Sequence, residues 1–306
     1  MKQAIIDIGS NSMRLTVYKV NGSEFKILFK EKAMTGLAGY VENGVLSSEG
    51  IQCACSDLLR FKEILATLEI SNVAVFATAS LRNIQNTDEA IHAVKAATGF
   101  CVDVLTGAEE ALCGFYGAMH DSHLKNGAFI DIGGGSTEVL RFEDGRAVNE
   151  ISYPVGSLRL YKDCVKNILP GKGSIRRIEE ALTLEIDKNP WFTFDRTSTL
   201  LCVGGTARAI LKITQKAYGL SYDSNHIKAK QLREILSLLC SKDKDMIQLL
   251  LKSMPERIHT MVPGAMILEH ICRRFQAEDI VICKYGAREG YLCRTILNLD
   301  DQNPES

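Results

Sequence analysis

The sequence has almost no excess of charge of either sign. Its 36 lysines and arginines balance 37 aspartates and glutamates, for a formal net charge of −1, so the chain as a whole attracts neither nucleic acid nor an anionic membrane. Prolines are also few, 6 in 306 residues, while 46% of the residues are apolar and 24% are charged. This is the composition of an ordinary globular protein and not of a disordered chain. Any anionic ligand must therefore be held by local groups.

Long apolar runs and metal-binding cysteine patterns are absent as well. No apolar run approaches the roughly 18 to 20 residues of a membrane span, and residues 1–3 lead directly into the apolar AIIDI, which is too short for a signal-peptide core. The ten cysteines and six histidines show no zinc spacing, no CxxC pair and no HExxH pattern. These absences predict a soluble cytoplasmic protein with reduced cysteines and with no nucleic-acid or membrane partner.

What the chain does contain is one local pattern written twice. IDIGSNSMRL at residues 6–15 and IDIGGGSTEV at residues 130–139 lie 124 positions apart. Alternating strand residues follow each copy, and then comes a hairpin dipeptide, Asn21-Gly22 in the first and Asp144-Gly145 in the second. Each copy therefore predicts strand, glycine turn, strand, tight turn, strand, and an internal duplication fixes the architecture before any motif is interpreted.

The segments after the two copies also correspond. Periodicity predicts helices and buried strands in alternation, so that each half reads βββαβαβα, with extra helices in the second half. The predicted strands after the triplets are 73–78, 101–105, 200–203 and 280–283, and the predicted helices begin near 47, 88, 107, 157, 206 and 287. A chain of 306 residues suffices for two domains of about 150 residues. We expect an N-terminal domain at 1–124 and a larger C-terminal domain at 125–306, whose last helix can pack back on the first.

Such a duplicated α/β arrangement resembles the acetate kinase, sugar kinase, heat-shock cognate and actin superfamily, whose two RNase H-like domains hold a phosphorylated ligand in the cleft between them. This likeness concerns the fold and does not by itself assign a reaction.

The two glycine turns are the predicted phosphate-binding elements. Their backbone N–H groups can converge on phosphate oxygens, because glycine allows φ > 0 and adds no side-chain bulk. Asp131 and Glu138 then offer hard oxygen ligands to Mg²⁺, and Asp7 matches Asp131 in the first copy. A tight hairpin is the alternative for a triple glycine, and the matching first copy speaks against it. The predicted phosphate contacts in these turns are Ser10, Asn11, Ser12, Gly133, Gly134, Gly135 and Ser136.

A third glycine element follows a buried strand in LLCVGGTARAI. There Gly205 and Thr206 would place free amides and a hydroxyl at a helix N-terminus; the alternative is a plain strand-to-helix turn. In FATASLRN, Arg82 also follows a buried strand and could fork onto phosphate oxygens, unless it is only a surface arginine. Arg288 and Glu289, adjacent in YGAREGYL, are expected to serve a structural network at the domain junction.

Two adjacent glutamates in LTGAEEAL open the third helix and have separable roles. If Thr106 is the N-cap, Glu109 completes a capping box by reaching back to the cap N–H. Glu110 lies about 100° further round the helix and is not needed for capping. It is the predicted general base, which takes a proton from water as the water attacks phosphorus; the alternative is a solvated charge favoured by the helix dipole.

Seven stretches between residues 7 and 290 together resemble the exopolyphosphatase and guanosine pentaphosphate phosphohydrolase family. They are DIGSNSMRL, TASLRN, TGAEEA, DIGGGSTE, VGGTAR, ERIHTMVPGAMIL and YGAREG. The resemblance implies Mg²⁺-dependent hydrolysis, with Mn²⁺ as an alternative metal, of a terminal phosphate from polyphosphate or from the pentaphosphate alarmone. It also implies that Glu110 is the base, that the Asp131 turn holds phosphate and metal, that Asp7 with Ser10 to Ser12 forms the facing wall, and that Arg82 binds phosphate. Dimerisation is common in this family, so the resemblance is compatible with a homodimer.

Two departures from the family pattern shape the prediction. Many relatives have an arginine in the third-strand region before a glycine-rich turn, where this chain has EKAMTGLAGY with Lys30 and Lys32. Longer relatives continue into a helical region that grips long polyphosphate, whereas this sequence ends at Ser306. We therefore expect an exopolyphosphatase that prefers short chains. The alternatives are a guanosine pentaphosphate phosphohydrolase, a kinase on the same fold, or a phosphate-ligand sensor without turnover.

Overall fold

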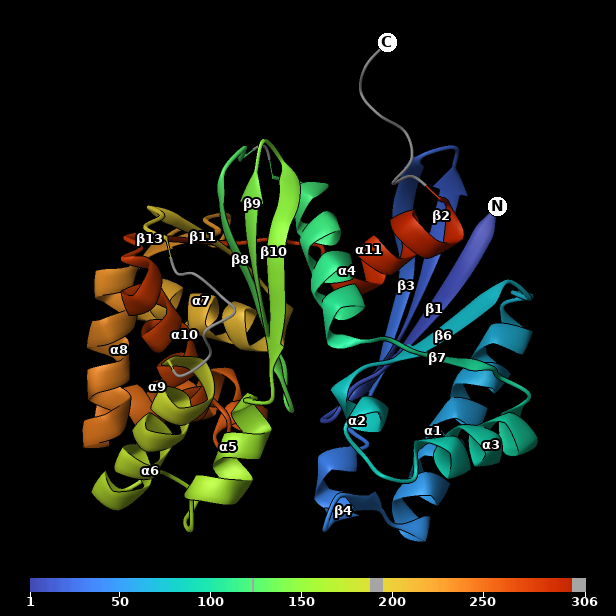
Figure 1. Ribbon diagram of the computed structural model, residues 1–306, viewed down its shortest axis with the longest axis horizontal. Helices are drawn as coiled ribbons and strands as arrows, with labels where there is room; N and C mark the ends of the chain where they lie inside the picture. Colours follow the sequence, from blue (N-terminus) through green and yellow to red (C-terminus); the bar gives the residue numbers. More distant parts are fainter. Residues whose placement is uncertain (123, 188–194, 299–306) are drawn as a thin grey trace. The chain divides into compact units, whose positions relative to one another are not determined.

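The computed structural model describes residues 1–122, 124–187 and 195–298 and divides the chain into two compact units (Figure 1). The N-terminal unit comprises Met1–Glu110 together with the chain from Tyr291 onward, and the C-terminal unit comprises Ala111–Gly290. Within the described ranges, no helix combines the length and the apolar character that crossing a membrane requires.

The N-terminal unit is built on a five-stranded mixed sheet in the order β3-β2-β1-β6-β7. β1 and β2, and β2 and β3, are antiparallel hairpin neighbours, whereas β6 and β7 run parallel to β1. The strands are β1 (Lys2–Ile8), β2 (Met13–Asn21), β3 (Glu24–Ala33), β6 (Val73–Ala77) and β7 (Val102–Val104).

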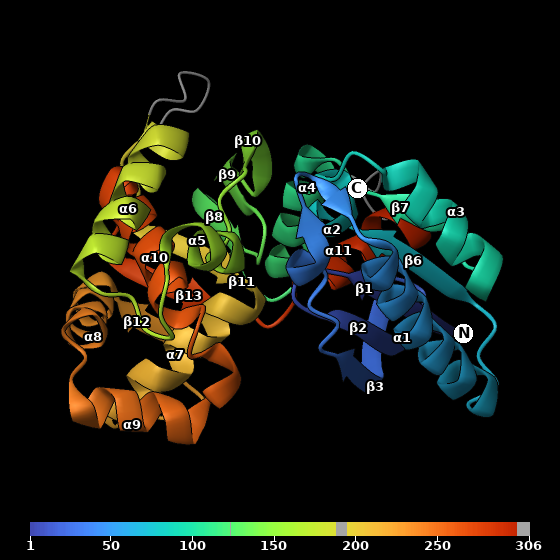
Figure 2. The same ribbon diagram turned by 90° about the horizontal axis from the view of Figure 1, so that it is seen from below.

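Two long helices cover one face of this sheet, α1 (Ser48–Thr67) and α3 (Thr87–Thr98), which lie side by side in Figure 2. α1 begins where the Ser47 side chain accepts a hydrogen bond from the Gly50 N–H, the usual N-cap arrangement. Its residues at helical spacing are buried against the even-numbered residues of β1. The remaining elements of this unit are η1 (Leu37–Tyr40), β4 (Val41–Glu42), β5 (Val45–Leu46), α2 (Ala79–Arg82) and η4 (Leu292–Ile296).

The C-terminal unit has a six-stranded sheet in the order β10-β9-β8-β11-β13-β12. Its strands are β8 (Gly127–Ile132), β9 (Thr137–Glu143), β10 (Arg146–Tyr153), β11 (Thr199–Val203), β12 (His226–Lys228) and β13 (Asp279–Ile282). Its helical segments are α5 (Ser157–Cys164), α6 (Lys172–Leu182), η2 (Thr183–Asp187), α7 (Gly204–Tyr218), α8 (Ala229–Ser241), α9 (Lys244–Ser253), η3 (Pro255–Arg257) and α10 (Met261–Phe275). Two helices continue past a unit limit, α4 (Gly107–Met119) and α11 (Ala287–Tyr291).

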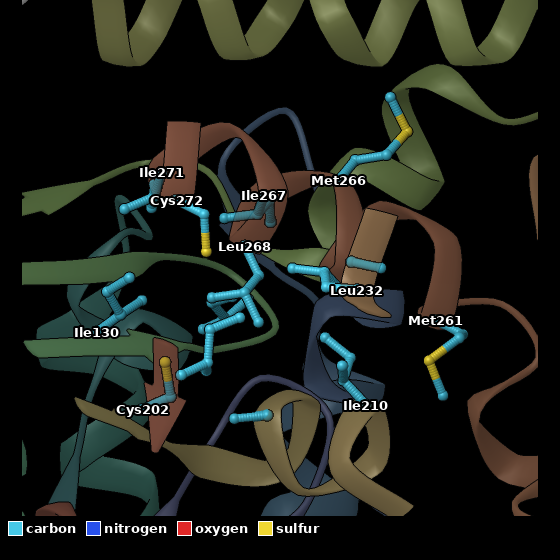
Figure 3. Packing of buried hydrophobic residues seen from close by; sticks show 14 of the residues in the cluster. Ile130, Cys202, Ile210, Leu232, Met261, Met266, Ile267, Leu268, Ile271 and Cys272 are labelled. Carbon is cyan, nitrogen blue, oxygen red and sulfur yellow. The ribbon is translucent and has the colours of Figure 1, made fainter. Parts of the chain in front are cut away.

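The larger core of the C-terminal unit is organised around α10, which is buried on almost every side. Figure 3 shows Ile267, Leu268 and Cys272 of this helix packed toward Ile130 and Cys202 of the sheet. The opposite face of the same sheet is covered by an aromatic cluster that includes α4 side chains. The sheet is therefore buried on both faces, as its nearly continuous apolar strands predict.

The predicted element order βββαβαβα is confirmed in both halves of the chain, and the additions include two strand elements. The short strand β12 pairs antiparallel with β13 and extends the second sheet, in the stretch between residues 206 and 275, where only helices were predicted. A two-stranded hairpin, β4 with β5, precedes α1. Both additions lie outside the duplicated core, so they leave the predicted architecture intact.

Candidate functional site

The two glycine turns share one backbone geometry. The Gly9 N–H donates to the Ser12 carbonyl oxygen at 3.3 Å, and the Gly133 N–H donates to that of Ser136 at 2.9 Å. A Cβ atom on Gly9 would lie 3.0 Å from the Ser12 oxygen, and one on Gly133 would lie 3.1 Å from the Ser136 oxygen. Neither glycine has left-handed backbone, so close approach, and not positive φ, is the reason for glycine at these positions. The duplication therefore extends to individual hydrogen bonds.

The Gly133 turn is held from behind by the start of α5. The Gly133 carbonyl accepts from the Ser157 N–H at 3.0 Å, and the Gly134 carbonyl accepts from Leu158 and Arg159 at 3.0 and 2.9 Å. In a trans peptide the N–H points opposite to the C=O, so the N–H groups of Gly134 and Gly135 point away from α5. Successive N–H groups that are free to point at one ligand can bind an anion, and this role of the turn stays a prediction.

In the N-terminal unit, the segment that leads into η1 takes the place that α5 has in the C-terminal unit. The Ser10 carbonyl accepts from the Ala38 N–H at 2.9 Å, and the Asn11 carbonyl accepts from the Gly36 N–H at 3.1 Å. By the same peptide geometry, the N–H groups of Asn11 and Ser12 point away from this segment. The stretch in which the chain departs from the family pattern thus supports the first turn.

The predicted metal ligands of the C-terminal unit are cross-strand neighbours. Asp131 on β8 lies opposite Glu138 on β9, and Glu138 is buried, with 1% of its surface exposed. The third glycine element also reaches Asp131: a Cβ on Gly204, which has φ +86°, would overlap the Asp131 carboxylate. The structure therefore brings DIGGGSTE and VGGT together around one acidic pair.

This donor set fits Mg²⁺ supplied with a phosphate substrate. The part of the chain that the structure describes has no group of three or more His, Cys, Asp or Glu side chains arranged to hold a metal. Mg²⁺ is usually bound through one or two carboxylates and completes its shell with water and substrate phosphates. Asp131 and Glu138 provide that number of hard oxygen ligands.

The side chains that lie opposite one another at the same place in the N-terminal sheet carry a different charge. Asp7 on β1 lies opposite Arg14 on β2, and Arg14 lies opposite Lys32 on β3. Arg14 and Glu138 each come seven residues after the turn aspartate of their copy, so the same place is basic in one unit and acidic in the other. Asp7 is therefore less suited than Asp131 to bind a cation, although its predicted metal role stays a prediction. Lys32 is the lysine of EKAMTGLAGY, and it lies opposite Arg14.

Arg82 and Glu110, predicted separately, form an ion pair. Arg82 Nη1 donates to Glu110 Oε2 at 2.7 Å and to the Leu105 carbonyl at 3.0 Å. Glu110 is 9% exposed. The Ser80 hydroxyl of α2 also donates to the Ile8 carbonyl at the end of β1, which places the Arg82 helix beside the Ser10 to Ser12 turn. The N-terminal candidates thus share the edge where β1, β6 and β7 end.

The neighbouring Glu109 makes the predicted capping box. Its Oε2 accepts from the Thr106 backbone N–H and hydroxyl, each at 2.8 Å, while the Thr106 hydroxyl accepts from the Glu109 N–H at 3.2 Å. The Thr106 backbone hydrogen bond and then its hydroxyl lower the pKa of Glu109 below its usual value. Capping thus uses Glu109, and Glu110 is paired with Arg82.

The remaining predicted residues have structural surroundings. Thr206 is 4% exposed, and its methyl group packs so closely on Gly264 of α10 that a Cβ there would overlap it; its phosphate role stays a prediction, as does that of Gly205. Glu289 is 3% exposed and accepts from the Gly286 N–H at 3.0 Å at the start of α11, in keeping with a supporting role. Arg288 is close enough to Arg208 to affect its charge.

Arg208 is a residue that sequence reasoning missed. Burial lowers the pKa of the Arg208 guanidinium, and repulsion from Arg288 lowers it further, while Asp131 opposes the shift. A partly buried cation whose charge interacts with the predicted metal ligand Asp131 belongs to the electrostatics of the site. The signal was present in VGGTAR, where an arginine one helical turn after Gly204 falls on the face that the glycine presents to Asp131.

The two sheets share one strand topology, and the first hairpin of each contains a glycine turn of the same hydrogen bonding. The chain is therefore a duplicated α/β protein. Within that class the chain belongs to the Ppx/GppA phosphatase family, whose model matches residues 16–299.

Individual relatives extend over most of the chain. Exopolyphosphatase 1 of Mycobacterium bovis is 24% identical over 304 residues, which cover 97% of this chain and 88% of that relative. The guanosine-5'-triphosphate,3'-diphosphate pyrophosphatase of Vibrio atlanticus is 29% identical over 239 residues, 76% of this chain and 47% of that relative. The crystal structure of an exopolyphosphatase from Cytophaga hutchinsonii matches with a TM-score of 0.83 at 20% identity, covering 97% of this chain and 98% of that one. This likeness confirms the predicted fold class.

Proposed function

We propose that the protein is a Mg²⁺-dependent hydrolase that removes the terminal phosphate from a phosphoanhydride chain. The observation that carries the proposal is the buried Glu110 carboxylate held by Arg82. A base must be oriented before it can take a proton from water, and a guanidinium that also binds the Leu105 carbonyl fixes one carboxylate oxygen in place. Family membership supports the reaction class.

Each group of site residues has its own role in the proposed hydrolysis. Amides of the two turns bind the non-bridging oxygens of the substrate phosphates, and Glu110 accepts a proton as the water oxygen bonds to the terminal phosphorus. The bond from that phosphorus to the bridging oxygen breaks, and the shortened chain leaves with the electron pair. Asp131 and Glu138 would hold Mg²⁺, which neutralises charge on the phosphate oxygens when bound; Mn²⁺ is the alternative ion.

The substrate is proposed as inorganic polyphosphate or guanosine pentaphosphate. The Mycobacterium bovis relative is named for the first activity and the Vibrio atlanticus relative for the second, and the geometry favours neither. The preference for short polyphosphate expected from the sequence stays a prediction. We also propose a cytoplasmic location, which ten free cysteine thiols support.

Phosphate release with Mg²⁺ tests the proposal, with short polyphosphate, long polyphosphate, guanosine pentaphosphate and ATP compared for the wild type and Glu110→Gln. Loss of a general base lowers the rate by about 10²- to 10⁴-fold, so Glu110→Gln should lose most of its turnover. Glu109→Gln is the matched control, because it changes the adjacent carboxylate of the same helix turn and should keep its turnover while weakening the cap.

Each other result has a defined meaning. Release mainly from guanosine pentaphosphate keeps the mechanism and selects that substrate. Consumption of ATP with a phosphorylated second product shows a kinase. Ligand binding without release from any substrate, or full turnover in Glu110→Gln, overturns the proposed hydrolase mechanism.

A further inference from the structure

An irregularity in β10 decides which side chain lies beside Glu138. The pairing of β10 with β9 shifts by one residue between Ala147 and Asn149, so that Val148 is the extra residue of a bulge. Val148 is 52% exposed. Beyond the bulge, Ser152 lies opposite Glu138. A one-residue slip exchanges the two faces of a strand, so if Val148 paired with Arg141 and the strand had no bulge, Ile151 would lie opposite Glu138.

The bulge thus places a hydroxyl next to a buried carboxylate. Ser152 Oγ donates to Glu138 Oε1 at 2.8 Å. Glu138 is almost completely buried, and a buried carboxylate needs hydrogen bonds and a compensating charge. Bulges are over-represented next to active sites, where they redirect a side chain. Ser152, Glu138 and Asp131 then form one continuous row across β10, β9 and β8.

We propose that Ser152 is a positioning residue that orients the Glu138 carboxylate for metal binding. The inference rests on the proposed function insofar as Glu138 and Asp131 are its metal ligands. The hydroxyl occupies one direction around Oε1, which limits rotation of the carboxylate. Ser152 itself need not touch metal or substrate. The duplication does not predict the role of Ser152, because the residue at the equivalent place of the first copy, opposite Arg14 on β3, is Lys32.

The test is the affinity for Mn²⁺ alone, measured by calorimetry on the full chain, for the wild type, Ser152→Ala and Ser152→Thr. Loss of a residue that orients a metal ligand typically costs about 10- to 100-fold in metal affinity, so Ser152→Ala should bind Mn²⁺ more weakly by that factor. Ser152→Thr keeps the hydroxyl and suits a strand, so it should restore most of the affinity. Thermal unfolding of each variant checks that it is folded.

A matched control is available in the same unit. Ser174 is buried and its hydroxyl accepts from Arg177 at 3.0 Å, but it lies on α6, away from Ser152, Glu138 and Asp131. Ser174→Ala should leave Mn²⁺ affinity unchanged. A merely structural role for Ser152 would lower the melting temperature of Ser152→Ala without changing its Mn²⁺ affinity, and would overturn the proposal.

The remaining outcomes separate this inference from the proposed hydrolase. Absence of Mn²⁺ uptake by the wild type at millimolar concentration overturns the positioning role. Normal phosphate release together with equal Mn²⁺ affinity in wild type and Ser152→Ala rejects only the inference. Weaker Mn²⁺ binding in Ser152→Ala, with no phosphate release from any substrate by the wild type, supports the inference and rejects the hydrolase.

Discussion

At the scale of single residues, the contact between Arg82 and Glu110 gives Arg82 a role beside the predicted one. The sequence predicts that Arg82 binds phosphate, and this stays a prediction; the structure shows Arg82 donating to Glu110 and to the Leu105 carbonyl. Both roles would lower activity when Arg82 is changed, so loss of activity alone does not distinguish them. A double-mutant cycle on Arg82 and Glu110, which measures the coupling between the two residues, does distinguish them.

We predict that Arg82→Lys lowers kcat by about 100-fold, because a misplaced catalytic group costs about that much and the ammonium of lysine does not reproduce the position and planar geometry of the guanidinium nitrogen that donates to both acceptors. In a Glu110→Gln background the same change should cost far less, since the base is already gone and residues that act as a unit are non-additive. Steady-state kinetics of the two single variants and the double variant test this. Additive losses would instead assign Arg82 to phosphate binding.

The residue scale also shows where sequence reasoning stops. Glu109 and Glu110 could be separated from sequence because helical geometry fixes their directions over one turn. Ser152 could not be found, because its place depends on the Val148 bulge, and no residue type marks such a bulge. Arg208 stood within a recognised motif, but only the folded structure shows that its charge interacts with that of Asp131.

At the scale of elements, the duplicated hairpins and their following strands and helices were predictable, because alternation and hairpin dipeptides act locally. The β4 and β5 hairpin was missed although Asn43-Gly44 between its strands is the same kind of signal. β12 was missed for a physical reason, since a strand of three residues forms only because β13 offers it an edge. The supports behind the turns were likewise out of reach, being contacts between distant segments.

One such support, α5 against the Gly133 turn, gives a prediction at this scale. Gly156 is the N-cap of α5, and a Cβ there would overlap the Gly134 carbonyl. Gly156→Ala should therefore destabilise the protein by about 1 to 3 kcal/mol, the usual cost of overpacking, and should raise KM by displacing the turn. Thermal unfolding and phosphate-release kinetics measure the two effects.

Gly171→Ala is the matched control for this substitution. Gly171 is also the N-cap of a helix, α6, but a Cβ there would meet no atom within 4 Å. It therefore reports the small intrinsic cost of alanine at an N-cap. Equal destabilisation by the two substitutions, with KM unchanged in both, would show that α5 does not support the turn.

At the scale of the whole molecule, we expect the core of the C-terminal unit to open and close together with the site of Asp131 and Glu138. Cys202 on β11 comes just before Val203, which pairs with Asp131, and Cys272 lies on α10 in the same core. Burial raises the pKa of both thiols well above the usual value, and each is 1% exposed. Buried thiols of raised pKa are inert until the surrounding structure opens.

Thiol labelling should therefore report opening of this unit. At pH 8 we expect Cys101, which is exposed, to react with a maleimide at once. Cys202 and Cys272 should react slowly, and the labelling rates of both should fall by the same factor when Mn²⁺ is added. The reason is linkage: a ligand held by Asp131 and Glu138 stabilises the closed unit by about 2.7 kcal/mol at 100 times its Kd, and global opening exposes both thiols. Mass spectrometry of digested samples gives each rate, with Cys101 as the internal control. Labelling of Cys202 that is fast, or slowed by Mn²⁺ without an equal effect on Cys272, would mean that the metal stabilises β11 locally and that the core and the site of Asp131 and Glu138 are separate cooperative units.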